Sequence, residues 1–533
     1  MTSDVEIFAP VSPTRGERFA LRVMQFGAVA VVLAVSTFMP FELDRFFVPK
    51  ELVLHLIAVV AGLLAFRAIS RAGSTRVDLL LITYLLLSAL SAAMATNRWA
   101  AMRALAISAS AVVIFWVARA LGNACLAKPL LDALALAVVL AAITSLLQTY
   151  GVETILFTES RAPGGTLGNR NFVAHVAAFG LPVCLLVALR SKRFLMASMG
   201  VAIVTASLVL TRSRAAWLAF AVVVLVFFVA MFRSNGRAWK RLATIVIMSC
   251  SAVVAALLIP NTLRWRSRNP YLESVTRVAE YQEGSGRGRL VQYERTLLMA
   301  ARHPLFGVGP GNWPVEYPAH VPPGDPSLNH SEPGMTYNPW PSSDWVAFVA
   351  ERGLLATILI ALVFISIVWR RRSRRRPPAR SPEPHSTVAK DPEETLIATA
   401  LLGTLAGAIV AGLFDAVLLI AVPAFLVWSA LGALWTAQNS RPMRWFVVVP
   451  VIVIAAAGAA RSAAQLVAMD IYSMKGDRTS LARAAQIDPG NYRLQLRLAR
   501  MGKLRCDHAR AAHALFPSAG AARDLARQCG RRE

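Results

Sequence analysis

The sequence predicts an all-α, polytopic membrane protein of about 12 to 13 transmembrane helices, with one long loop and a small helical C-terminal tail. Two observations support this fold class. Of the 533 residues, 56% are hydrophobic and only 16% are charged, whereas soluble domains are about 45–50% apolar and about 25% charged. The apolar residues also form long blocks, each about long enough to cross roughly 30 Å of hydrocarbon as a helix.

We identify about thirteen such blocks, and the first is long enough to remain a membrane helix rather than a cleaved signal peptide. The eleventh and twelfth leave two interpretations open, because Asp415 and the short join between them are also compatible with a re-entrant hairpin. The blocks lie at about 23–40, 51–68, 78–95, 100–118, 129–148, 171–189, 194–211, 215–232, 242–260, 345–369, 395–415, 417–436 and 445–461.

Lysine and arginine residues in the short joins predict the orientation, because cytoplasmic loops of membrane proteins are rich in both. With a cytoplasmic N-terminus, the basic joins all fall on the cytoplasmic side of the membrane. We expect this membrane to be a bacterial inner membrane, whose other side faces the periplasm. The segment 149–170, the join 211–214 and the loop 261–343 are then periplasmic. The Arg-, Pro- and Ser-rich stretch 370–394 becomes a cytoplasmic linker that we expect to be disordered.

The predicted parts are an N-terminus (1–22), nine helices (23–260), the periplasmic loop (261–344), further helices with the linker (345–463) and a periplasmic tail (464–533). The tail repeats ARAAQIDP (482–489) as ARAAHALFP (509–517), at a spacing of about 27 residues that resembles tetratricopeptide-type helix pairs. A helical hairpin of no particular family explains the pattern equally well. Either tail offers a surface for a protein partner.

Charge and cysteine usage exclude several classes of function. The net charge of +26 does not indicate nucleic-acid binding, because the basic residues lie between apolar blocks and form no basic face with interleaved aromatics. No cysteine spacing resembles a metal site, and neither a metal nor a cofactor is expected. Cys506 and Cys529 lie in the predicted periplasmic tail. Because the periplasm is an oxidising compartment, we predict a disulfide between them.

Two short motifs on the predicted periplasmic face contain candidate binding residues. GTLGNRN (165–171) precedes an apolar helix, and a turn with Asn169 and Asn171 there either presents amides to an anion or simply caps the helix. TRSRAAW (211–217) places Arg212 and Arg214 on the predicted periplasmic side, where positive residues are not needed to orient the chain in the membrane. Charge at such a depth suggests phosphate binding, with snorkelling to lipid phosphates as the alternative.

The long loop contains a third candidate segment, residues 286–313. Leu290, Tyr293, Leu297, Leu298 and Ala301 recur at helical spacing, which predicts an amphipathic helix near the membrane. Arg289 lies at its N-terminal end, a position that favours an anion. The following GVGPGNW is expected to form a rigid turn.

Together these segments resemble the O-antigen ligase and polymerase family. The resemblance rests on GTLGNRN, SRAAW (213–217), GRLVQY (288–293) with HPLFGVGPGNW (303–313), and DWVAFVAERGLL (344–355), and it covers about residues 160–365. It implies a membrane glycosyltransferase that needs no metal and takes its glycan from undecaprenyl pyrophosphate. The acceptor is a glycan or lipid A-core. By motif position, Arg214 and Arg289 match arginines that hold the pyrophosphate, with Arg212 beside them.

The sequence departs from the family at one position. Family members commonly read His-Asn-Asp-Tyr before the AERG segment, and the histidine is thought to activate the acceptor hydroxyl. Here the chain reads Ser342-Ser343-Asp344-Trp345. Serine is no base near neutral pH, so we assign the catalytic role to Asp344 or to a loop histidine, which leaves His330, His303 and His320 as candidates.

Two other classes of function remain open. A carrier or flippase for lipid-linked glycans would normally place ionisable residues at mid-membrane and show inverted repeats, and neither pattern is visible here. An inactive scaffold that recruits partners through its tail is consistent with the missing histidine.

Overall fold

The computed structural model describes residues 12–158, 161–231, 236–265, 267, 269–276, 284–373, 392–435, 441–474, 476–501 and 505–531. The chain is 76% helical, and the described residues contain 21 α-helices and no β-strand, which confirms the all-α class. Most of the predicted linker, residues 374–391, lies outside the described residues.

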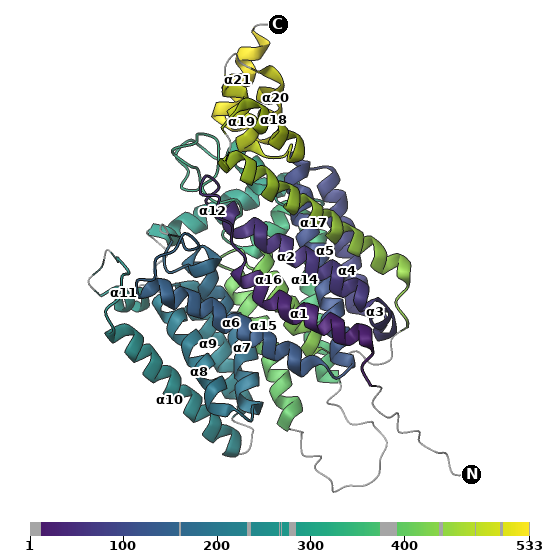
Figure 1. Ribbon diagram of the computed structural model, residues 1–533, viewed down its shortest axis with the longest axis vertical. Helices are drawn as coiled ribbons and strands as arrows, with labels where there is room; N and C mark the ends of the chain where they lie inside the picture. The colour runs from purple at the N-terminus through teal and green to yellow at the C-terminus, as the bar shows by residue number, and fades with distance from the viewer. Residues whose placement is uncertain are drawn as a thin grey trace.

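Each predicted apolar block overlaps one helix of a bundle (Figure 1). The first block, 23–40, was placed too late, because its helix runs from Arg15 to Leu33. Among the described residues, nine helices are long and apolar enough to cross a membrane, and three more are shorter apolar helices, so the chain is a multi-pass membrane protein. The bundle helices are α1 (Arg15–Leu33), α2 (Asp44–Leu64), α4 (Arg76–Ala93), α5 (Arg98–Asn123), α6 (Ala127–Thr149), α7 (Arg170–Arg190), α8 (Phe194–Leu210), α9 (Arg214–Met231), α10 (Gly236–Leu258), α14 (Asp344–Ser373), α15 (Pro392–Gly412), α16 (Ala421–Leu434) and α17 (Trp445–Met474).

The remaining helices are short. They are α3 (Phe66–Ala72), α11 (Pro270–Thr276), α12 (Gly284–Arg302), α13 (Trp313–Glu316), α18 (Arg478–Ile487), α19 (Tyr492–Arg500), α20 (Cys506–Leu515) and α21 (Gly520–Gly530), with the 3-10 turns η1 (Gly165–Leu167) and η2 (Tyr317–His320). Helices α18 to α21 form the tail at the top of Figure 1.

The two ends of the bundle are identified by their contacts. At one end Arg71 pairs with Glu17 (2.9 Å), and the Ser74 amide donates to the Arg441 carbonyl (2.6 Å). At the other end, which we call the tail end, Asn97 Nδ2 donates to the Leu515 carbonyl of the tail (3.1 Å). This division follows the predicted alternation of the joins. Which compartment each end faces stays a prediction.

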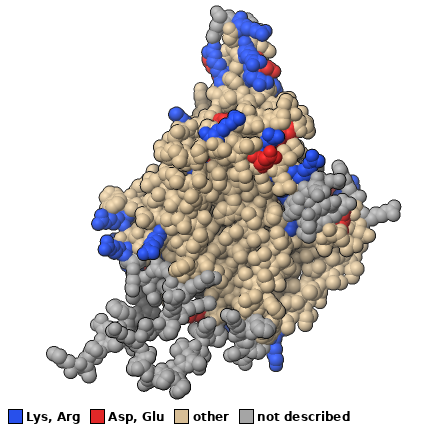
Figure 2. All heavy atoms as spheres, turned by 180° about the vertical axis from the view of Figure 1, so that it is seen from behind, with Lys and Arg blue, Asp and Glu red and all other residues tan. Residues whose placement is uncertain are grey.

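Between the ends, the flank of the bundle is apolar. Figure 2 shows a broad surface almost without charged side chains, with basic groups on the tail and at the margins. Large apolar side chains are also exposed on the bundle helices, as at Phe26 of α1, Leu63 of α2 and Leu79 of α4, which are 70%, 61% and 64% exposed. Such a belt suits contact with lipid hydrocarbon.

Helices α15 and α16 both run through the bundle, so the pair is not a shallow hairpin. Gly412, which ends α15, lies against Asp344 at the tail end. At the far end of α16, Trp435 stacks on Phe115 and lies under the Arg119 guanidinium. All 14 residues of α16 are buried, which places this short helix in the core.

The segment GVGPGNW forms the rigid turn that the sequence predicts. Gly307 has φ +69°, and a Cβ there would lie 2.4 Å from the Glu351 backbone carbon, so only glycine fits. The Val308 amide donates to the Ala350 carbonyl (2.9 Å). These contacts fix the loop against α14 and hence fix the position of α12.

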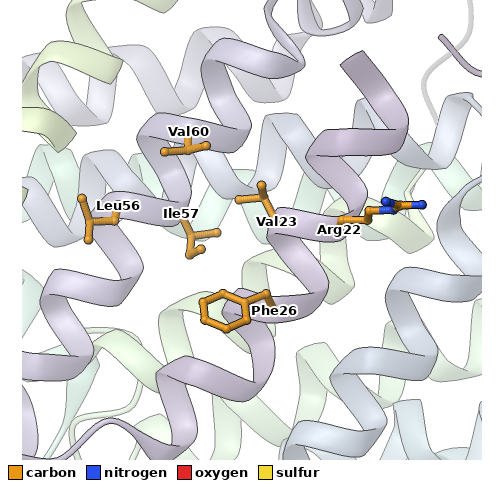
Figure 3. Close-up of a pocket in the computed structure, with 6 residues that line it drawn as sticks. All are labelled: Arg22, Val23, Phe26, Leu56, Ile57 and Val60. Carbon is orange, nitrogen blue, oxygen red and sulfur yellow. The ribbon is translucent and has the colours of Figure 1, made fainter. Parts of the chain in front are cut away.

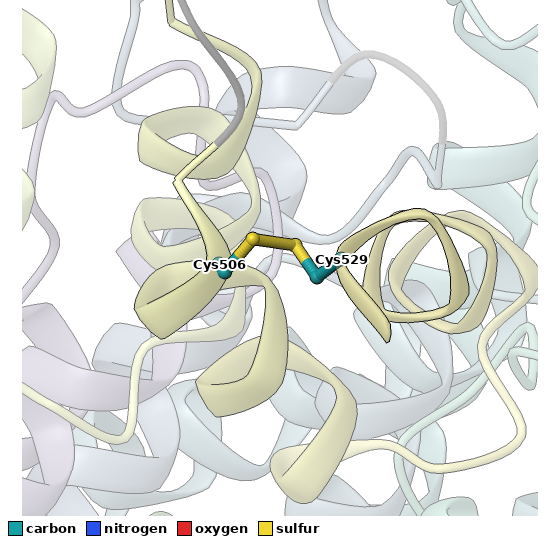
Figure 4. The surroundings of a disulfide bond; sticks show 2 residues. All are labelled: Cys506 and Cys529. Carbon is teal, nitrogen blue, oxygen red and sulfur yellow. A yellow bond between two sulfur atoms is a disulfide. The ribbon is translucent and has the colours of Figure 1, made fainter. Parts of the chain in front are cut away.

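The tail consists of two helix pairs closed by the predicted disulfide (Figure 4). Cys506 of α20 and Cys529 of α21 are bonded, with their Cα atoms 5.5 Å apart. The preceding membrane helix is longer than expected, because α17 continues to Met474 rather than ending near 463. Each repeated sequence ends the first helix of a pair. The tetratricopeptide-type interpretation stays a prediction.

Candidate active site

The N-terminus of α7 is built by a glycine turn at the tail end. Gly168 has φ +73°, and a Cβ there would lie 2.4 Å from the Phe46 ring, so the turn requires glycine. Asn169 caps the helix, since its side chain accepts from the Asn171 amide (3.0 Å). Asn171 turns toward another segment, and its Nδ2 donates to Asp415 Oδ2 (3.4 Å).

Two arginines flank one indole beside this turn. The guanidiniums of Arg212 and Arg170 lie 4.9 Å and 5.0 Å from the Trp265 ring centroid. Arg212 Nε also donates to Ser274 Oγ (2.9 Å), and its Nη2 lies 3.6 Å from Glu273 Oε2. Arg212 has φ +55°, a backbone strain that is typical of functional sites.

Arg161 is a third arginine that adds to the positive charge of this region. Both Arg161 and Arg212 act electrostatically on Arg170. Burial raises the pKa of the nearby Tyr271 hydroxyl, although the Arg212 charge acts in the opposite direction. Like charges gathered at a helix N-terminus favour binding of an anion.

The two arginines matched to the family lie on elements beside α7. Arg214 is partly buried and opens α9, which packs against α7 and α15. Arg289 is partly buried near the start of α12 and acts electrostatically on His175 of α7. Their convergence on one pocket stays a prediction.

Asp344 is fully buried at the start of α14. The Val417 amide donates to Oδ1 and Oδ2 (both 3.0 Å), and the Leu418 amide donates to Oδ2 (2.9 Å). Ser343 Oγ donates to the Gly412 carbonyl (3.1 Å). This geometry favours a structural role for Asp344 in the turn before α16, and the base role predicted from the sequence stays a prediction.

Asp415 presents a partly exposed carboxylate in the same turn. Its Oδ1 accepts from the Ala416 amide (2.9 Å), and Oδ2 accepts from Asn171. It lies close enough to Asp344 and His175 to act on both electrostatically. Asp415 is therefore an acidic group bonded to the first turn of α7.

Helix α12 forms hydrogen bonds with both the Ser342 segment and the turn after α15. The Tyr293 hydroxyl donates to the carbonyls of Ser342 (2.6 Å) and Leu413 (2.9 Å). Gln292 Oε1 accepts from the Ser342 amide (2.7 Å). The helix that carries Arg289 thereby joins the Ser342 segment to the turn that carries Asp415.

The three loop histidines lie on the segment between α12 and Ser342. His330 is exposed in a turn whose Pro333 carbonyl accepts from the tail amide of Gly520 (2.8 Å). His303 is exposed, and His320 Nδ1 lies 3.0 Å from the Glu316 carbonyl.

A shallow apolar pocket of about 370 Å³ lies between α1 and α2 (Figure 3). Its lining includes Phe26, Leu56 and Val60, with Arg22 at one edge. This lining suits an acyl chain, and it belongs to the halves of α1 and α2 away from the tail end. Among the described residues no group of three His, Cys, Asp or Glu side chains is placed to hold a metal ion.

Fold and site together define a multi-pass membrane protein with a cationic site at the tail end. A family model described as O-antigen ligase matches residues 199–360, which is less than a third of the chain. The matched segment is thus similar to that family, and it contains Arg212, Arg214, Arg289 and Asp344. No curated protein matches the chain. The similarity supports a part in glycan transfer during O-antigen assembly.

The sequence reasoning missed Arg170, His175 and Asp415 as site residues. Arg170 lies inside the GTLGNRN motif, and Asp415 is an acidic residue in an apolar run, so each carried a signal. His175 stands within an apolar block, where only the fold reveals its neighbours.

Proposed function

We propose that the protein transfers a glycan from undecaprenyl pyrophosphate to an acceptor sugar, by ligation onto lipid A-core or by chain polymerisation. The reaction takes place at the tail end, which we assign to the periplasmic face of the bacterial inner membrane. The similarity of residues 199–360 to O-antigen ligases supports this reaction class.

The observation that carries the proposal is the gathering of arginines around the N-terminus of α7. Arg212 and Arg170 share the Trp265 indole, and Arg161 acts on Arg170 electrostatically. A departing pyrophosphate gains negative charge in the transition state. Fixed guanidiniums stabilise that state more than the ground state, so they accelerate the reaction without a metal ion.

Arg214 and Arg289 are proposed to hold the pyrophosphate, with Arg212 as a third ligand. Guanidinium groups bind phosphate oxygens in pairs, and one pyrophosphate offers enough oxygens for several. Arg289 lies in the second turn of α12, which begins at Gly284, and its charge already acts on His175 of α7. Asn169 and Asn171 form the donor-site turn.

The proton acceptor is best sought among the carboxylates of this region. Asp344 and His330 were the candidates from sequence. Asp415 is better supported by geometry, because it is partly exposed and close to α7, while Asp344 is fully buried with its oxygens bonded to amides. A base must reach the hydroxyl that it deprotonates.

A carrier for lipid-linked glycans is the second candidate function, and a scaffold is the third. The charged groups of the candidate site gather at the tail end of the bundle, which favours the enzyme over the carrier.

The surface glycan of a strain lacking this protein tests the proposal. Undecorated lipid A-core would identify a ligase, and a single-repeat glycan would identify a polymerase. Complementation with Arg289→Ala should fail, while Arg302→Ala, an exposed residue at the end of the same helix, should restore the glycan. A normal glycan profile in the deletion strain would overturn the proposal.

A further inference from the structure

His175 is a buried histidine without a hydrogen-bond partner. It lies on α7 and is 1% exposed, and neither ring nitrogen has a partner within the described part of the chain. A buried polar group without a partner costs free energy, so such groups are rare and often functional. The other deeply buried membrane histidine, His55 of α2, has its Nδ1 2.8 Å from Ser110 Oγ.

The surroundings of His175 belong to the candidate site. Asn171, which donates to Asp415, lies four residues earlier on α7 and therefore on the same helix face. Two charged groups act on the ring, namely Asp415 from the turn between α15 and α16 and Arg289 from α12. Asp415 also acts electrostatically on Asp344, at the start of α14.

Proton transfer to Asp415 would create a new hydrogen-bond donor, and the His175 ring has nitrogens that can accept from it. As the acceptor hydroxyl attacks the sugar, its O–H bond breaks and the proton passes to an Asp415 oxygen. The new bond forms between the acceptor oxygen and the sugar carbon, and the bond to the pyrophosphate breaks with its electron pair leaving on the phosphate. Asp415 is then a neutral acid with an O–H that needs an acceptor.

We propose that His175 is a positioning residue whose imidazole nitrogen accepts this O–H and so strengthens Asp415 as a base. The inference rests on the proposed function and extends it, because His175 would support Asp415 in the role of the family histidine that is missing at Ser342. Neither ring nitrogen has a partner in this structure, so the bond requires a rotation of the ring or of the carboxyl. A carboxylate supported in this way takes up a proton more readily.

The experiment compares His175→Phe with His175→Gln in the purified full-length protein, using a lipid-pyrophosphate-linked glycan and its acceptor. Phenylalanine keeps the ring but removes both nitrogens, whereas glutamine keeps an acceptor oxygen. His175→Phe should lower turnover about tenfold to a hundredfold, the range that a hydrogen bond to an ionisable group is worth. It should also move the acidic limb of the pH profile to lower pH, because Asp415 alone is a weaker base. His175→Gln should retain most of the activity.

His55→Phe is the matched control, since His55 is equally buried (1% exposed) in α2. It should leave the pH profile unchanged. Donor binding and the melting temperature establish that each variant is folded, and in Asp415→Asn the additional change His175→Phe should have no effect. A His175→Phe enzyme with wild-type turnover and pH profile would overturn the role of His175 and leave the proposed function intact. Absence of transfer by the folded wild-type protein would overturn the function itself.

Discussion

The carboxylate of Asp344 accepts three hydrogen bonds from the amides of Val417 and Leu418. Asp344→Asn replaces one of the two acceptor oxygens by an amide group that cannot accept. We therefore expect a loss of roughly 2 kcal/mol in stability, because buried amides lose their partner. Thermal unfolding in detergent measures this loss. An unchanged melting temperature with a strongly reduced turnover would instead support Asp344 as the base.

At the same scale, the sequence identified candidate residues better than their partners. Arg212 and Arg214 stood out because charge near a membrane helix end is costly unless it serves a purpose. The sequence could not reveal that Asn171 contacts Asp415, since the two are 244 positions apart. That contact depends on how α15 and α16 join.

At the scale of elements, α12 shows what periodicity can and cannot predict. The amphipathic pattern predicted a helix over this segment, and the helix runs from Gly284 to Arg302. Its apolar residues Leu290, Leu297 and Leu298 are 51%, 48% and 54% exposed, while Thr296 and Met299 are buried. In a membrane protein the apolar face also suits lipid, so periodicity alone does not say which face contacts the protein.

Tyr293→Phe tests whether α12 holds the site together. The change removes one hydroxyl, which donates to the carbonyls of Ser342 and Leu413. We expect a loss of about 1 kcal/mol in stability and a clear fall in turnover, because the position of Arg289 depends on this link. Kinetics and thermal unfolding of the same preparation measure both effects. Unchanged kinetics would show that α12 is positioned by other contacts.

The disulfide gives a second test at this scale. Cys506 and Cys529 are 23 positions apart, and closing such a loop stabilises a fold by about 3 kcal/mol. Cys529→Ser should lower the stability of the tail by about that amount, as measured by limited proteolysis. In protein purified without reductant, both thiols should resist alkylation, with the exposed Cys125 as the reactive control. Alkylation of both tail cysteines would refute the bond.

At the scale of the whole molecule, hydropathy predicted the fold class and the order of the bundle helices. The long apolar blocks suffice for this, because a membrane span must satisfy its own backbone hydrogen bonds as a helix. The sequence did not predict where α17 ends, since residues 462–474 continue a helix with a mixed pattern. Nor did it decide between a hairpin and two full helices at α15 and α16, which tertiary packing decides.

The topology is also tested at this scale. Reporter fusions at residues 240 and 380 should give cytoplasmic signals, and fusions at 320 and 500 should give periplasmic signals. The basic joins are the physical reason, because positive residues are retained in the cytoplasm. A cytoplasmic signal at 320 or 500 would move the candidate site to the wrong side of the membrane for a periplasmic acceptor.

The most direct test of the central claim is glycan transfer by purified protein in detergent, where a carrier has no two compartments to connect. We predict that the wild-type protein joins the glycan of a lipid-pyrophosphate donor to its acceptor. Arg214→Ala and Arg289→Ala should each reduce the rate about 100- to 1,000-fold while the protein remains folded. Lysine at either position should restore little, because it lacks the two-pronged geometry of arginine. Full activity in either alanine variant would contradict the account.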